Sequence, residues 1–241
     1  MKYISHRGNR IDNFLENTQA AFLSALEFPL DMIEMDLRLS HDGVWMVYHD
    51  RTLSRLFGQE LWFSQTKSKT LQSHGILTLK QVLTLINGRT ELYLDIKQEP
   101  LPTKNITKLW NQLANVVTNQ KNKWSAKKIY LAAFSSQIIT FLAEYQQSQE
   151  IKFPLGLITG NDYQTLNPDL ISKLDLISFE ADILTTKQEV NHIRKQHPDL
   201  EIYVYVLNDL ISLTKYQNLE VDGVLTDHPE LFLNLQRLHS K

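Results

Sequence analysis

The sequence of 241 residues contains no cysteine, which excludes disulfide bonds and any chemistry that needs a thiolate. Its formal net charge of -2 excludes the broad basic surface of nonspecific nucleic-acid binders, so a phosphate site would be a local pocket. No window approaches the roughly 20 apolar residues that cross a bilayer, and the first residues leave no room for the apolar stretch of a signal peptide. We expect no stable membrane insertion, and the lack of cysteine suits a cytoplasmic location.

What the sequence does contain is a regular alternation of short strand-like runs with longer segments of helical apolar spacing. The strand-like runs are Tyr3–Ser5, Met32–Leu39, Leu92–Ile96, Ile129–Phe134, Pro154–Ile158, Leu174–Phe179, Glu201–Leu207 and Gly223–Leu225. The helical segments are Thr18–Glu27, Thr78–Ile86, Ile106–Val117, Gln137–Tyr145 and Lys187–Lys195. No Gly-rich dinucleotide fingerprint follows any strand. The pattern therefore predicts an α/β fold, a closed (β/α)8 TIM-type barrel forming one domain over residues 1–241.

A further strand, Val44–Tyr48, follows Asp42 and Gly43, a dipeptide favoured in tight turns. We expect a β-hairpin extension after the second barrel strand. If Asp42 and Gly43 are the two central residues of the turn, Asp36 lies opposite His49. The polar stretch 51–76 predicts an excursion over the barrel mouth, in which Trp62 and Phe63 are candidate pocket walls.

Carboxylates alternate with apolar residues along two of the predicted strands. Glu34 and Asp36 share one face of Met32–Leu39, and Asp95 and Lys97 share a face with Tyr93. Inward-facing charges are costly unless a cation compensates them, and a set of oxygen ligands suits Mg²⁺ or Ca²⁺. The alternative at this point is a buried ion-pair network among Glu34, Arg38, Asp95 and Lys97.

Two imidazoles and a guanidinium converge on these acids. His6 and Arg7 end the first strand, where barrel enzymes place their chemistry, and the hairpin returns His49 to the level of the acids. A divalent ion with Arg7 and Lys97 would neutralise phosphoryl oxygens. One histidine would remove a proton and the other would supply one to the leaving oxygen.

The sequence resembles the glycerophosphodiester phosphodiesterase family over nearly its whole length. The resemblance is carried by His6-Arg7-Gly8, Glu16-Asn17-Thr18, Glu34-Met35-Asp36, His49-Asp50 with Leu53 and Arg55, Asp95-Ile96-Lys97, Phe134-Ser135 and the segment from Val221 to Pro229. It implies a TIM barrel with a metal on Glu34, Asp36 and Asp95, an acid/base pair in His6 and His49, and phosphate binding by Arg7 and Lys97. It also implies a small-molecule glycerophosphodiester substrate that yields an alcohol and sn-glycerol 3-phosphate, or a lysophospholipid.

Several positions lie outside this core. Asp95 stands where the family usually has Glu, and Tyr205 lies in a seventh-strand segment that departs from the family pattern. Glu180, Tyr205 and Phe134 are candidate pocket residues. Glu16 and Asn17 read as loop anchors at a helix start, and Asp222 and Asp227 as turn or capping residues.

Two other classes of function compete with the hydrolase. A barrel could bind a phosphorylated ligand without turning it over, in which case binding occurs with no product. A barrel glycosidase also uses paired carboxylates, but it explains neither His6 nor His49 and would keep its activity after metal removal.

Overall fold

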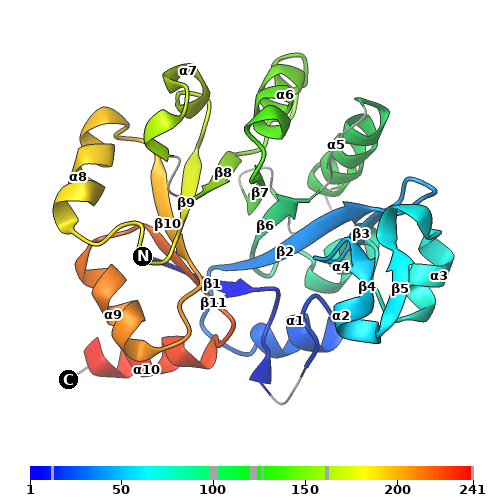
Figure 1. The fold of residues 1–241 in the computed structure, drawn as a ribbon, viewed down its shortest axis with the longest axis horizontal. Helices are drawn as coiled ribbons and strands as arrows, with labels where there is room; N and C mark the ends of the chain where they lie inside the picture. The colour runs from blue at the N-terminus through cyan, green and yellow to red at the C-terminus, as the bar shows by residue number, and fades with distance from the viewer. Residues whose placement is uncertain (12–13, 98–102, 120–123, 126–127, 161–162, 240–241) are drawn as a thin grey trace.

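The protein is a closed barrel of parallel strands surrounded by helices (Figure 1). The computed structural model describes residues 1–241 except 12–13, 98–102, 120–123, 126–127, 161–162 and 240–241. The barrel strands are β1 (Lys2–His6), β2 (Met32–Leu39), β6 (Glu91–Ile96), β7 (Ile129–Ala133), β8 (Leu155–Thr159), β9 (Leu176–Glu180), β10 (Glu201–Tyr205) and β11 (Gly223–Thr226). Each pairs in parallel with its neighbours, and the β1–β2 pairing closes the ring. The TIM-type barrel predicted from the sequence is confirmed.

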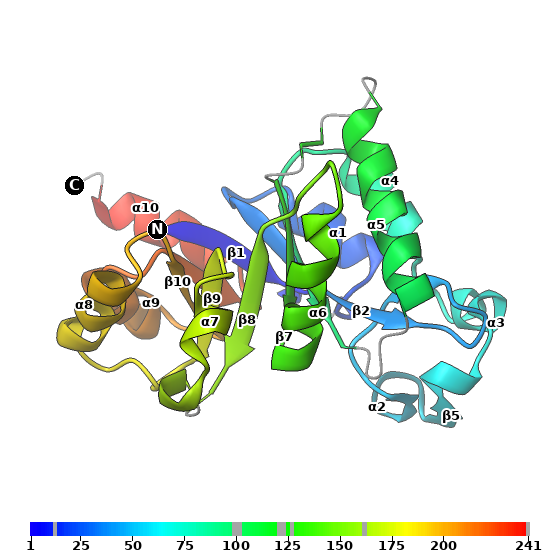
Figure 2. The ribbon, with the colours of Figure 1, turned by 90° about the horizontal axis from the view of Figure 1, so that it is seen from above.

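Helices follow the strands and cover the outside of the barrel, as Figures 1 and 2 show from two directions. They are α1 (Gln19–Ala25), α4 (Leu79–Ile86), α5 (Thr103–Thr118), α6 (Ser136–Gln147), α7 (Pro168–Ile171), α8 (Lys187–Gln196), α9 (Leu210–Asn218) and α10 (Glu230–His239). Thr78 and Thr186 begin α4 and α8 with capping boxes, in which the side chains of Gln81 and Glu189 return the hydrogen bond. No helix in the described ranges is long and apolar enough to cross a membrane.

Side-chain alternation divides the barrel into an outer and an inner layer. Ile33, Met35 and Leu37 of β2 are buried in the outer core against the helices. The inner core contains Met32 and residues of seven other strands, among them Tyr93 and Tyr203, whose rings meet edge to face. Since this interior is packed with side chains, chemistry is confined to the mouth of the barrel.

The strand after β2 forms the predicted hairpin, but its register differs from the prediction. β3 (Trp45–Val47) pairs antiparallel with β2 and sets Leu37 opposite Val47. The backbone N–H of Tyr48, rather than a His49 group, therefore donates to the carbonyl oxygen of Asp36, at 3.0 Å. The two-residue turn was the wrong assumption: Ser40 and Val44 close a three-residue loop in which Gly43 has a φ of 70°.

The excursion after the hairpin has its own small core. It comprises β4 (Thr52–Leu53), α2 (Ser54–Phe57), β5 (Gln59–Trp62), a short 3-10 helix (Phe63–Gln65) and α3 (Ser68–Ser73). Figures 1 and 2 place it to one side of the barrel, beside the end of β2. Phe63 is buried there against Tyr48, with ring centroids 5.1 Å apart, so it is not a pocket wall. Trp62 is exposed.

Gly8 makes the close approach of the first loop to α1 possible. Its φ is 87°, and a Cβ at this position would lie 2.8 Å from the carbonyl carbon of Ala21. We expect Gly8→Ala to lower the free energy of unfolding by about 2–4 kcal/mol, through backbone strain and overpacking together. Gly75→Ala is the matched control, because Gly75 has a φ of 80° and open space around it. Urea unfolding of both variants measures the difference, and equal losses would contradict this account.

Candidate active site

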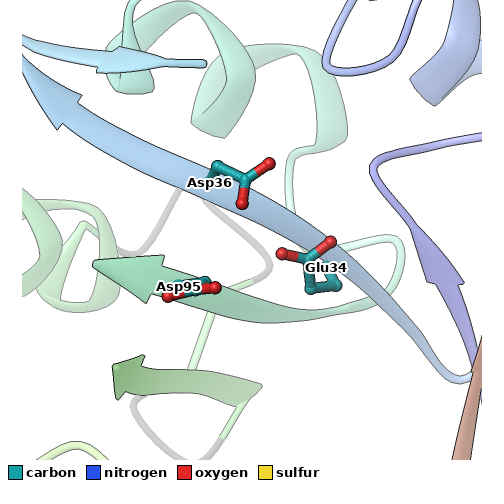
Figure 3. A group of neighbouring side chains, drawn as sticks. All are labelled: Glu34, Asp36 and Asp95. Atoms are coloured by element: carbon teal, nitrogen blue, oxygen red, sulfur yellow. The ribbon is translucent and has the colours of Figure 1, made fainter. Parts of the chain in front are cut away.

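Three buried carboxylates meet at the mouth of the barrel, two from β2 and one from β6 (Figure 3). In-register pairing of the strands sets Asp36 beside Asp95, and Glu34 stands one inward position earlier on β2. One oxygen of each carboxylate lies within 4.8 Å of the others. Asp95 Oδ1 is buried and accepts no hydrogen bond from any described residue, and the buried Asp36 Oδ1 has an ion pair with Lys97 but no hydrogen bond. A cluster of carboxylate oxygens with unfilled acceptor positions could hold a metal ion, so the residues fit the group.

Two cations lie against the same acids. Lys97 Nζ is 2.5 Å from Asp95 Oδ2 and 3.3 Å from Asp36 Oδ1. Arg7 Nε is 3.1 Å from Asp36 Oδ2, and the backbone N–H of Arg7 donates to Glu34 Oε2 at 3.1 Å. The ion pairs weighed as an alternative therefore exist in part, but Arg38 belongs to none of them within the described residues. Its guanidinium donates to the backbone carbonyls of His49 and Lys97 instead.

These cations do not compensate all three acids equally. Burial, followed by the charge of Asp36, raises the pKa of Glu34 well above its usual value. Burial also raises the pKa of Asp95 to about 6, against the opposing effect of Lys97. Burial acts the same way on Asp36, but the charges of Arg7 and Lys97 outweigh it and lower that pKa to about 2. Arg7 and Lys97 thus offset two of the three carboxylates, and a further cation is needed before the charged form of Glu34 is favoured.

His6 reaches the cluster from the end of β1. Its Nδ1 is 2.8 Å from Asp227 Oδ1, and its Nε2 is 3.8 Å from Glu34 Oε2. Asn208 donates from Nδ2 to the other oxygen of Asp227 at 2.9 Å. The contact at Nδ1 orients the ring, so that Nε2 faces the acids. Burial lowers the pKa of His6, which favours the neutral imidazole.

His49 has the same kind of arrangement and interacts electrostatically with Asp36 of the cluster. Its Nδ1 is 2.6 Å from Asp50 Oδ1, and Arg55 Nε donates to Asp50 Oδ2 at 2.7 Å. Burial lowers the pKa of His49 as well, although the nearby Asp36 opposes that effect. Two neutral imidazoles, each held by a carboxylate, therefore stand near the acids.

The sequence does not predict the carboxylate partners of the two histidines, nor the contact of Asn17 with the acid cluster. The sequence predicts a turn or capping role for Asp227, whereas its carboxylate orients His6. Asn17, interpreted as a loop anchor, donates from Nδ2 to Asp36 Oδ2 at 2.8 Å. The direct succession of His49 and Asp50 was the one available signal, because adjacent residues after a strand can hydrogen-bond to each other. Asp222 is structural as expected, accepting from the backbone N–H of Ile202.

The three candidate pocket residues lie at the carboxyl ends of β7, β9 and β10. Phe134 follows β7 and is 54% exposed, with Lys97 Nζ 4.7 Å from its ring centroid. Tyr205 meets Phe134 edge to face at 6.2 Å between centroids. Glu180 pairs in register with Tyr205, so both side chains face inward. The structure thus brings Phe134 and Tyr205 into contact and sets Glu180 beside Tyr205.

We expect Asp227→Asn to lower kcat of diester cleavage by roughly 10- to 100-fold, the usual effect of losing a residue that orients an active-site histidine. The amide keeps the shape but can also donate to Nδ1, which favours the wrong tautomer of His6. Steady-state kinetics measure the loss. Asp222→Asn is the control from the same segment, and an equal loss in both variants would contradict the role of Asp227.

A TIM barrel with three clustered acids, two cations and two oriented imidazoles at its mouth defines the class of barrel hydrolases that act on phosphate esters. Residues 6–231 match the glycerophosphoryl diester phosphodiesterase family. The chain belongs to this family.

Individual relatives agree with that assignment in sequence, and solved structures agree with the fold. A glycerophosphodiester phosphodiesterase of Bacillus altitudinis is 31% identical over 248 residues, covering 95% of each chain. Human lysophospholipase D GDPD1 is 26% identical over 95% of this chain and 83% of its own length. Among solved structures, the glycerophosphodiester phosphodiesterase of Thermotoga maritima superimposes with a TM-score of 0.76 at 24% identity, over 98% of both chains. An Oleispira antarctica phosphodiesterase, solved in complex with the product sn-glycerol-3-phosphate, has a TM-score of 0.75 at 20% identity, over 100% of this chain and 97% of its own.

Proposed function

We propose that this protein hydrolyses glycerophosphodiesters to an alcohol and sn-glycerol 3-phosphate, with a divalent metal and a pair of histidines. The observation that carries the proposal is the meeting of His6 and His49 at one buried acid cluster, each with a carboxylate on Nδ1. Family membership supports the reaction class, and the crystallised product of the Oleispira relative supports the product.

Separate residues bind the metal and the phosphate. Glu34, Asp36 and Asp95 would hold the metal, which would supply positive charge for the phosphoryl oxygens. Their hard oxygen ligands suit Mg²⁺ or Ca²⁺. Arg7 and Lys97 bind the phosphate, because each lies against the cluster and carries a raised pKa that keeps it charged.

The two imidazoles move the protons. One histidine takes a proton from the attacking water, and the other gives a proton to the oxygen of the leaving group. The lowered pKa of both rings leaves them neutral near pH 7, which suits the base. The acid must gain its proton when the anionic diester binds. Phe134, Glu180 and Tyr205 lie at the ends of β7, β9 and β10 and form the wall for the organic part of the substrate.

A panel of substrates tests the proposal. Purified protein is assayed with Mg²⁺ or Ca²⁺ against glycerophosphocholine, glycerophosphoethanolamine and the corresponding lysophospholipids, with glycerol 3-phosphate and lysophosphatidate as the measured products. We expect glycerol 3-phosphate from the diesters. Binding of the diesters without any product would show a ligand-binding barrel and overturn the proposal.

Cleavage of lysophospholipids is the second candidate, favoured by the likeness to human lysophospholipase D GDPD1. The exposed rings of Phe134 and Trp62 provide apolar surface for an acyl chain. Release of lysophosphatidate at a higher kcat/KM than glycerol 3-phosphate would establish this substrate. A single catalytic domain over residues 1–241 and a cytoplasmic location remain predictions.

A further inference from the structure

Arg55 lies outside the acid cluster but contacts two carboxylates that lead to its active-site neighbours, those of Asp50 and Glu16. It belongs to α2 in the excursion, and its side chain is 46% exposed. Its guanidinium donates from Nε to Asp50 Oδ2 at 2.7 Å, and from Nη2 and Nη1 to the two oxygens of Glu16 at 2.6 Å and 3.2 Å. A planar guanidinium can bind two carboxylates at fixed angles in this way, whereas an ammonium cannot.

The first branch leads to a histidine. Asp50 accepts from Arg55 on Oδ2 and contacts His49 Nδ1 with Oδ1 at 2.6 Å. Arg55 therefore holds the carboxylate that orients the ring. Asp227, which has the same role for His6, is held by the amide of Asn208 at 2.9 Å and the guanidinium of Arg10 at 3.2 Å.

The second branch leads to the phosphate-binding arginine. Glu16 Oε1 accepts from Arg55 Nη2 and also from Arg7 Nη1 at 3.1 Å, and its side chain is 3% exposed. Arg7 continues to Asp36 through Nε at 3.1 Å. The backbone of Arg7 has a φ of 61°, an uncommon conformation for a residue with a side chain, so its position depends on its surroundings.

We infer that Arg55 is a positioning residue that aligns the acid/base group His49 and the phosphate-binding group Arg7 through two separate carboxylates. This inference rests on the proposed function. Arg55 touches neither His49 nor Arg7 directly, so its effect passes through Asp50 and Glu16. The excursion thereby becomes part of the active site and not only a side structure of the barrel.

The two branches predict different kinetic effects. Asp50→Asn disturbs the histidine alone, so kcat should fall while KM changes little. Glu16→Gln disturbs Arg7, so KM for the diester should rise and the affinity for inorganic phosphate should fall. Arg55→Ala should show both effects and lower kcat/KM by roughly 10- to 100-fold. Arg55→Lys keeps the charge but lacks the planar guanidinium. It should therefore still show at least one of the two kinetic losses.

Kinetics of these variants and phosphate titration by calorimetry form the test, with Arg51→Ala as the control from the same excursion. Arg51 is exposed and forms no ion pair among the described residues. We expect the loss in Arg55→Ala/Asp50→Asn to be smaller than the product of the single losses in kcat, because both changes act on one branch. If Arg55→Ala does not fold, Arg55→Lys is measured in its place.

Wild-type kcat, KM and phosphate affinity in folded Arg55→Ala would overturn the inference, and so would fully multiplicative losses in the double variant. A change in melting temperature alone would show a purely structural role. The proposed function fails separately, since it predicts glycerol 3-phosphate from the wild-type protein whatever these variants do.

Discussion

His49→Ala is expected to lower kcat of glycerophosphodiester cleavage by about 10²- to 10⁴-fold, the range that general acid–base catalysis contributes. His49 is held by Asp50 at one ring nitrogen, so the other nitrogen is available to the reacting atoms. The same loss is expected for His6→Ala, because the two rings have different proton-transfer roles and neither can replace the other. Steady-state release of glycerol 3-phosphate measures the effect.

The fold should survive His49→Ala, since His49 is partly exposed and follows the short strand β3. Circular dichroism and the urea midpoint check this. His41→Ala serves as the control, because His41 is an exposed histidine in the loop of the same hairpin. Near-normal kcat in either His6→Ala or His49→Ala would end the two-histidine mechanism.

Glu34→Gln should weaken metal binding by at least about 100-fold, more than the 10- to 100-fold that supporting residues contribute. The metal-free protein should lose little, within about 1 kcal/mol of unfolding free energy, because a glutamine oxygen can still accept from the backbone N–H of Arg7. The raised pKa of Glu34 also predicts a small loss of stability, because the metal-free protein favours the neutral carboxyl, which glutamine resembles. Calorimetric titration with Mg²⁺ and Ca²⁺ measures the affinity.

Glu91→Gln is the matched control for Glu34→Gln. Glu91 begins β6, the strand that carries Asp95, and pairs with Lys2 at 3.3 Å. The same chemical change there should leave the metal affinity as it is. Unchanged affinity in Glu34→Gln would remove Glu34 from the metal site.

Metal binding should also depend on pH in a definite direction. The pKa of Asp95 is raised to about 6, and that of Glu34 is raised as well. Both carboxyls therefore take up protons at a higher pH in the folded protein than in the unfolded chain. Protons then compete with the metal, which needs the charged forms. The increase in melting temperature on adding metal should be full well above pH 6 and decline as the pH falls through about 6. An increase that is larger at pH 5 than at pH 8 would contradict the assignment.

The sequence predicted the barrel and most of the candidate site because both depend on local patterns. Alternation along β2 alone faces Glu34 and Asp36 inward, and in-register pairing with β6 then sets Asp95 beside them. Side-chain period and strand order are sufficient for that inference. No contact between distant loops is needed.

Features that depend on loop geometry or distant contacts were not predicted. The hairpin register shifted by one residue because the loop has three residues, which the sequence Asp42-Gly43 does not distinguish from two. Asp227 contacts His6 across 221 positions of sequence, and Arg55 contacts Glu16 across 39. Such pairs arise only when the barrel closes and the excursion folds back, so their chemistry appears in the structure alone.

The most direct test of the proposed reaction is product release by the wild-type protein with and without metal. The protein is treated with chelator, the chelator is removed, and glycerol 3-phosphate formed from glycerophosphodiesters is measured before and after adding Mg²⁺ or Ca²⁺. We expect no product from the stripped protein and full recovery with one of these ions. Equal product from the stripped protein would contradict this expectation.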